Sequence, residues 1–297
     1  MLTMSIPRRT HLSGVPRLSS YAAWWLLGVG MFLVIMIWSE AIGMPARFPR
    51  WGYLSIGTLA TISMGLRAAN LRTASDYVAL FGLLGMFSSL FNALCCLALT
   101  TNAPLADAAY ARADAALGFD WVAYHRWLQS DPNLQWLLKI CYYSAGPEIV
   151  GCAVLLCLLG RTRDYQHFVW SLLISLAIAA TFNAVAPALG AGYFYGANEP
   201  FWVAGLLAIR AHTGNVASAF GSVSFPSFHT VIALLCPYAV RYVRWLVLAV
   251  LILNGAMLFS IPIEGSHYLV DMIGGGVTAV LAVVLANYVM SRFESVY

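Results

Sequence analysis

Long apolar segments recur along most of the chain, from residue 21 to residue 290. A helix needs about 20 predominantly apolar residues to cross the hydrocarbon core of a bilayer. Segments near this length occur at residues 21–39, 51–69, 77–101, 134–159, 168–189, 226–241, 244–262 and 268–290. The pattern therefore predicts an all-α protein, a polytopic membrane helical bundle with about eight transmembrane helices.

The composition supports a membrane protein and argues against a water-soluble one. Of the 297 residues, 61% are hydrophobic and only 9% are charged, whereas about 25% are charged in a typical soluble domain. The net charge of +4 follows from basic loops on one membrane side, so we expect a lipid bilayer and no nucleic acid as a partner. The six cysteines lack C-x-x-C metal spacing, and we expect no metal site.

The basic residues suggest an orientation, because cytoplasmic loops are enriched in Lys and Arg. With a cytoplasmic N-terminus, ten of the sixteen basic residues fall on that side: Arg8, Arg9, Arg17, Arg67, Arg72, Arg161, Arg163, Arg241, Arg244 and Arg292. The same topology puts two long segments, residues 101–133 and 190–225, on the outer face. We expect a single integral membrane domain over residues 1–297, and the sequence predicts no particular oligomeric state.

The segment Phe225-Pro226-Ser227-Phe228-His229 ends the second outer segment and begins a helix. A proline is tolerated in the first helical turn, where its missing N–H costs nothing, and we expect Pro226 there. Free backbone amides and the positive end of the helix dipole make such a start a natural phosphate site. The sequence therefore predicts a candidate phosphate site at this helix start, next to His229.

The segment from Glu264 to Asp271 carries the second candidate group. His267 and Asp271 are four residues apart, so on a helix they share one face and the carboxylate can orient the imidazole. An oriented histidine is a plausible nucleophile. Helix counting puts His229 and His267 at the same membrane face, because one helical hairpin separates them.

These two segments resemble the P-S-x-H and H-x-x-x-D motifs of the type 2 phosphatidic acid phosphatase superfamily. The forms F-P-S-F-H and E-G-S-H-Y-x-x-D are most similar to its inositolphosphotransferase branch, typified by inositol phosphorylceramide synthase. The resemblance extends over about residues 107–276. It implies a phosphatase- or phosphotransferase-like core over residues 102–280, preceded by additional helices in residues 1–75.

The resemblance also implies a mechanism that uses neither a metal nor a cofactor. His267 would attack phosphorus, Asp271 would position His267, and His229 would protonate the leaving oxygen. Ser227 and nearby backbone amides would hold phosphate oxygens. Two departures from the family pattern concern phosphate binding: the K-x6-R-P motif has no exact match, and Ile261 stands where an arginine is usual.

Another cation must then bind the phosphate charge. Arg210, on the same outer segment as His229, is the first candidate, and Lys139 is the second. Glu264 and Tyr268 adjoin His267 and could orient the site or contact a head group.

The expected function is that of a membrane enzyme acting on lipid phosphates, either as a phosphatase or as a phospho-head-group transferase. Two alternatives remain open. One is a proton-coupled transporter, with a proton or ion relay formed by His229, His267, Asp271 and Glu148; the other is an inactive scaffold that binds lipid phosphate. We expect the protein in a bacterial inner membrane, with its active site facing the periplasm.

Overall fold

The computed structural model describes residues 18–44, 46–48, 50–197, 202–217 and 224–295. Within these ranges the chain forms helices and no strand, which confirms the all-α prediction. The helices are α1 (Leu18–Ala41), α2 (Arg50–Ala68), α3 (Arg72–Leu99), α4 (Asp107–Ala116), α5 (Trp121–Gln129), α6 (Pro132–Tyr143), α7 (Ala145–Leu158), α8 (Thr162–Val185), α9 (Ala191–Phe194), α10 (Val203–Arg210), α11 (Phe228–Val240), α12 (Arg244–Glu264) and α13 (Leu269–Ser295).

Five of the described helices contain a stretch that is long and apolar enough to cross a membrane. They are α1, α3, α8, α12 and α13, and the bent pair α6–α7 makes a sixth if it counts as one span. The predicted number of eight is therefore not confirmed. The helix α11 has 13 residues and rises only about 20 Å, which is less than a hydrocarbon core of about 30 Å.

The span expected at residues 134–159 is interrupted at Ser144. Two helices, α6 and α7, meet there at an angle of 44°. Pro147 lies in the first turn of α7. Because proline lacks an N–H and its ring clashes with the carbonyl four residues earlier, it disfavours a helix that continues through Tyr143. The proline therefore accounts for the break.

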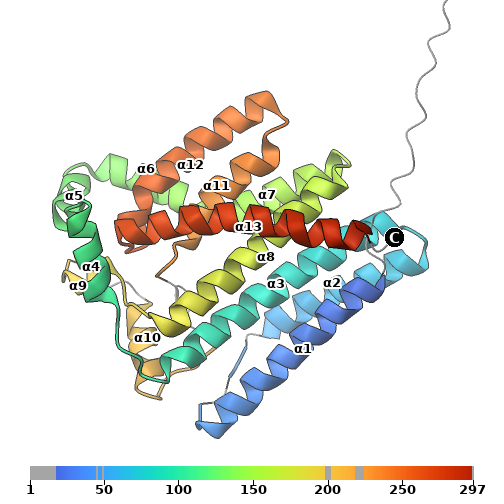
Figure 1. Ribbon diagram of the computed structural model, residues 1–297, viewed down its shortest axis with the longest axis horizontal. Helices are drawn as coiled ribbons and strands as arrows, with labels where there is room; N and C mark the ends of the chain where they lie inside the picture. Colours follow the sequence, from blue (N-terminus) through green and yellow to red (C-terminus); the bar gives the residue numbers. More distant parts are fainter. Residues whose placement is uncertain (1–17, 45, 49, 198–201, 218–223, 296–297) are drawn as a thin grey trace, which may run out of the picture.

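The long helices pack side by side around α3 and α8 (Figure 1). The helices α1 and α2 pack against α3, which packs against α8, and α8 in turn contacts α11 and α13. The short helices α4, α5, α9 and α10 gather at one side of the view in Figure 1, where α13 begins. The first motif lies at the start of α11, and the second lies at the start of α13. Both motifs are therefore next to this group of short helices.

Ion pairs join two turns at the opposite end of the bundle. Asp164, at the start of α8, accepts from Arg161 at 2.7 Å and from Arg241 at 3.1 Å. Arg241 follows the last residue of α11. The arginines therefore tie the α7–α8 turn to the α11–α12 turn, away from the two motifs.

The start of α11 approaches α13 very closely at Gly275. A Cβ on Gly275 would lie 2.5 Å from the backbone oxygen of Ser227 and 2.8 Å from Cβ of Thr230. A Cβ on the next residue, Gly276, would have its nearest neighbour, Leu234 Cδ1, at 3.9 Å. Gly275 thus permits a backbone contact directly beneath the first motif, whereas Gly276 has room for a side chain.

We predict that Gly275→Ala destabilises the protein and Gly276→Ala does not. The added methyl group at Gly275 must displace backbone, and such overpacking costs about 1–3 kcal/mol in the free energy of unfolding. Thermal unfolding in detergent should show a lower melting temperature for Gly275→Ala only. Equal melting temperatures for the two variants would contradict this account of the packing.

Candidate active site

His267 and Asp271 form a buried pair at the start of α13. His267 Nδ1 lies 3.1 Å from Asp271 Oδ2, and the two residues are 4% and 0% exposed. His267 is in the turn before α13, and Asp271 is in its first helical turn. The contact expected from the sequence is therefore present, although His267 is outside the helix. With Nδ1 held by the carboxylate, Nε2 is the nitrogen left for chemistry.

The same carboxylate oxygen connects three segments of the chain. Asp271 Oδ2 also accepts a hydrogen bond from Ser224 Oγ at 2.8 Å and from the backbone N–H of Tyr268 at 3.0 Å. The backbone oxygen of Asp271 accepts the N–H of Ser227 at 2.9 Å. The carboxylate therefore fixes the orientation of His267, and the backbone of the same residue fixes the start of the α11 segment beside it.

Pro226 and Ser227 take positions that differ from those expected. Pro226 precedes the helix, and its peptide bond with Phe225 is cis. Ser227 is the N-cap of α11, and its completely buried hydroxyl accepts the N–H of Thr230 at 3.4 Å. The expectation that Pro226 lies in the first turn is wrong, because the capping residue comes after it. The helix starts at Phe228.

His229 lies in the first turn of α11 and stacks on Tyr142 from α6. Their ring centroids are 3.9 Å apart, and the ring planes differ by 18°. If Gly265 carried a Cβ, that atom would lie 3.0 Å from the hydroxyl oxygen of Tyr142 and 2.5 Å from Cδ2 of His267. Tyr142 therefore stacks on His229 and reaches the turn of Gly265 that precedes His267. The sequence analysis missed this tyrosine because only the α6–α12 packing brings it to the histidines.

Two buried aspartates from α4 hold the loop that carries His267. Asp114 accepts the backbone N–H groups of Leu269 and Val270 at 2.8 and 2.9 Å and so caps α13. Burial raises the pKa of the Asp114 carboxyl, and these two N–H donors oppose the rise. Asp107 accepts the hydroxyl of Tyr268 at 3.0 Å. Sequence reasoning missed both roles, because the two aspartates resemble solvated acids of an exterior loop.

A second loop is fastened to the turn before His267. Ser266 has a left-handed backbone conformation, with φ 55°. Its backbone oxygen accepts the N–H of Ala191 at 2.7 Å, and its hydroxyl accepts the N–H of Gly192 at 2.8 Å. A Cβ on Gly190 would lie 2.7 Å from that backbone oxygen. The close approach therefore requires glycine at position 190, and it holds the α8–α9 loop against the site.

The remaining predicted site residues lie around the histidines in different ways. Tyr268 is fully buried and makes the contact with Asp107 already described. Arg210 Nη1 donates to the backbone oxygen of Ala103 at 3.1 Å, so it links α10 to the segment before α4. The residues that line the cavity containing His229 and His267 do not include Arg210 in the described part of the chain.

Lys139 and Glu264 line a separate polar pocket of about 240 Å³. Its other lining residues are His125, Gln129, Gln135, Tyr143, Trp202 and Ile263. Trp202 also lines the larger cavity that contains both histidines. The polar pocket is thus adjacent to the histidine site, and it offers charged, amide and imidazole groups. Among the residues that the structure describes, no group of three His, Cys, Asp or Glu side chains could hold a metal ion.

We predict that Asp114→Ala reduces both stability and activity. Losing the acceptor for two backbone N–H groups should cost about 2 kcal/mol and loosen the turn that positions His267. Asp120→Ala is the matched control, because Asp120 caps α5 through the N–H of Ala123 and does not contact the site. Thermal unfolding and turnover would be measured for both variants, and only Asp114→Ala should lose activity. If Asp120→Ala lost as much activity as Asp114→Ala, the positioning role of Asp114 would be contradicted.

Comparisons with known proteins identify the family. Neither the curated proteins nor the solved structures contain a match to this chain. The family model of the PAP2 superfamily matches residues 108–285, which is more than half of the chain. This range contains both histidines, Asp114 and Asp271, and members of the superfamily are typically phosphatases. The chain therefore belongs to the PAP2 superfamily, that of the type 2 phosphatidic acid phosphatases, and is an integral membrane protein with a phosphatase- or phosphotransferase-type activity on lipid phosphates.

Proposed function

We propose that the protein transfers phosphoryl or phospho-head-group units from a membrane lipid by a double displacement through His267. The observation that carries the proposal is the His267–Asp271 pair, at 3.1 Å, whose histidine lines the same cavity as His229. A nucleophile oriented by a carboxylate and faced by a second histidine is suited to covalent transfer with general acid–base assistance.

In the first step, Nε2 of His267 attacks phosphorus and the bond from phosphorus to the lipid oxygen breaks. The proton on Nδ1 stays hydrogen-bonded to Asp271, which stabilises the positive charge that develops on the imidazole. His229 gives its proton to the leaving lipid oxygen. The negative charge of the bound phosphate favours the protonated form of His229. A phosphohistidine and a free lipid alcohol result.

In the second step, an acceptor oxygen attacks the phosphohistidine while His229 takes the acceptor's proton. The bond between Nε2 and phosphorus breaks, and His267 returns to its starting form. With water as the acceptor the enzyme is a phosphatase. With a lipid alcohol as the acceptor it is a phospho-head-group transferase of the inositolphosphotransferase type, and the polar pocket beside the site, lined by Lys139, Glu264 and two glutamines, is suited to a polar head group.

We propose Lys139 as the cation that neutralises phosphate charge as it approaches the histidines. Its side chain is exposed within the polar pocket, where Glu264 is its charged neighbour. Arg210 is the weaker candidate, because its guanidinium is engaged with the backbone of Ala103. Ser227, although it caps α11, would present the amides of the helix start to the phosphate.

The orientation belongs to the same proposal. The arginine-rich turns lie at the end of the bundle away from the histidines. Because cytoplasmic loops are enriched in basic residues, the arginine-rich end would be cytoplasmic. The histidine end would then face the periplasm of a bacterial inner membrane. The core would comprise residues 102–280, and residues 1–75 would add helices to it.

The proposal predicts that His267→Ala abolishes turnover. Purified protein in EDTA would be given a panel of lipid phosphates and phosphoinositides, and both phosphate release and head-group transfer would be measured. We expect wild-type activity in the chelator and at least about 1,000-fold less in His267→Ala, because removing a covalent nucleophile from a concerted site has effects of this size. The products distinguish a phosphatase from a transferase.

His212→Asn is the matched control for that experiment. His212 lies at the same end of the molecule with φ 57°, a conformation that asparagine tolerates. Its ring contacts the backbone oxygen of Thr100, away from both cavities that contain site residues. Equal turnover by His267→Ala and wild type would refute the mechanism, and binding of lipid phosphate without any turnover by the wild type would favour the scaffold alternative.

A separate prediction concerns the phosphate cation. Lys139→Gln should lower kcat/KM about 10–100-fold, because a charge-assisted contact to phosphate contributes about 1.5–3 kcal/mol. Arg126→Gln, which removes an exposed cation of α5 that does not line the polar pocket, should leave kcat/KM within about twofold. A similar loss in both variants would show a general electrostatic effect and would count against Lys139.

A further inference from the structure

The histidines stand at one end of a large apolar cavity of about 690 Å³. Its lining includes His229, His267 and Tyr142 at the site. From there it extends between α1, α2, α3 and α8. The aromatic rings of Phe32, Phe48 and Tyr53 also line it, with centroids 5.7–6.0 Å apart. A polar reaction centre therefore opens into a long hydrocarbon-like space.

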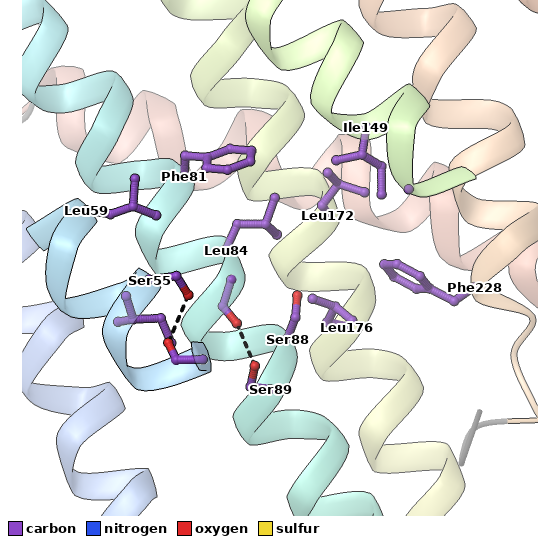
Figure 2. Close-up of a pocket in the computed structure, with 14 residues that line it drawn as sticks. Ser55, Leu59, Phe81, Leu84, Ser88, Ser89, Ile149, Leu172, Leu176 and Phe228 are labelled. Atoms are coloured by element: carbon purple, nitrogen blue, oxygen red, sulfur yellow. Dashed lines mark hydrogen bonds between the residues drawn. The ribbon is translucent and has the colours of Figure 1, made fainter. Parts of the chain in front are cut away.

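A second apolar cavity, of about 380 Å³, adjoins the first (Figure 2). Figure 2 shows Phe228 at one side of it, facing Leu172 and Leu176 of α8. The cavities share six lining residues: Gly52, Ile56, Ser88, Ser89, Leu176 and Phe228. The wall that the two cavities share therefore includes residues of α2, α3 and α8, and in α11 it includes Phe228, which directly precedes His229.

The walls of both cavities come largely from helices outside the residues that the family model matches. The helices α1, α2 and α3 precede residue 108, where the family match begins. They contribute Gly57 and Met86 to the larger cavity, and Leu59 and Phe81 to the smaller one. This chain therefore has a two-branched apolar space that its N-terminal helices build onto the superfamily core.

The few polar groups in the walls do not change this apolar character. The hydroxyl of Ser55 donates to the backbone oxygen of Gly52 at 3.0 Å, and that of Ser89 donates to the backbone oxygen of Gly85 at 3.1 Å (Figure 2). Because these hydroxyls are bonded within their own helices, hydrocarbon can occupy the space without leaving them unpaired. Both volumes lie within the range of about 300–1,000 Å³ that is usual for ligand sites.

We propose that the two cavities bind the two hydrocarbon chains of a two-chain lipid phosphate, one chain in each branch, with the phosphate held at His229 and His267. The inference rests on the proposed function, and it assigns to α1–α3 the selection of two-chain over single-chain and short-chain donors. The wall that the branches share includes Phe228, which directly precedes His229, and this matches the geometry of a lipid whose two chains diverge close to the phosphate.

Glycines provide variants that fill one branch at a time. Apart from the neighbouring backbone of its own helix, a Cβ on Gly57 or on Gly85 would have no atom within 4 Å, so the first carbon of a larger side chain displaces no neighbour. Gly57 lines only the larger cavity, and Gly85 lines only the smaller one. Gly65, on the same helix as Gly57, has equally open surroundings and lines neither. Gly65→Leu is therefore the matched control for Gly57→Leu and Gly85→Leu.

The experiment measures kcat/KM for dioleoyl phosphatidic acid and for dihexanoyl phosphatidic acid in detergent micelles. We expect Gly57→Leu and Gly85→Leu each to lower kcat/KM for the dioleoyl lipid about tenfold, because each leucine displaces about two chain methylenes. The dihexanoyl lipid should be used equally by all variants, and Gly65→Leu should match wild type on both. Melting temperatures equal to wild type verify that the variants fold.

A binding measurement separates this inference from the proposed function. In the His267→Ala background, dioleoyl phosphatidic acid should raise the melting temperature through mass action, and either filling variant should reduce that rise. If Gly57→Leu and Gly85→Leu both showed the same preference between the dioleoyl and dihexanoyl lipids as Gly65→Leu, the inference would be overturned, even with an active wild-type enzyme. A loss in only one of them would overturn the two-chain assignment. If the lipid raised the melting temperature and the filling variants reduced that rise, but wild type showed no turnover, only the proposed function would be overturned.

Discussion

The candidate site depends on the hydrogen bonds that the carboxylate of Asp271 accepts. One oxygen contacts the His267 ring and also accepts from the Ser224 hydroxyl and the Tyr268 backbone N–H. These donors come from the segment before α11 and from the turn before α13. A buried carboxylate is costly unless it is hydrogen-bonded, so the folded state is favoured only when these segments meet. The same contacts, all of them to Oδ2, also orient the imidazole.

Two further aspartates extend this arrangement outward. Asp114 accepts two backbone N–H groups at the start of α13, and Asp107 holds the Tyr268 hydroxyl together with the backbone N–H groups of Leu189 and Gly190. Through them, α4 supports both the loop of His267 and the loop after α8. The short helices at this end of the bundle therefore act as a rigid frame for the histidines, while the long helices supply hydrocarbon-facing walls.

The coexistence of these two environments explains how a membrane-embedded site can handle a charged phosphate. Polar groups gather in the turns before α11 and α13 and in the pocket of Lys139 and Glu264. Apolar side chains from α1, α2, α3 and α8 line the space that leads away from the histidines. A lipid phosphate has the same division, with a charged group at one end and hydrocarbon at the other. This correspondence is the basis of the proposed placement of a lipid phosphate, with its phosphate at the histidines and its hydrocarbon in the cavities.

The sequence by itself determined the all-helical membrane class and both histidine motifs, because apolar length and the spacing of His267 and Asp271 are local properties. It also indicated that the two motifs share one end of the bundle, since helices reverse direction at each hairpin. The break in the expected span at residues 134–159, with Pro147 in the first turn of α7, was found only in the structure. Tertiary packing alone decided the stacking of Tyr142 on His229, the capping by Asp107 and Asp114, and the engagement of Arg210 with Ala103. These contacts join residues far apart in the chain. Their formation depends on how whole helices pack, which no local pattern of residues encodes.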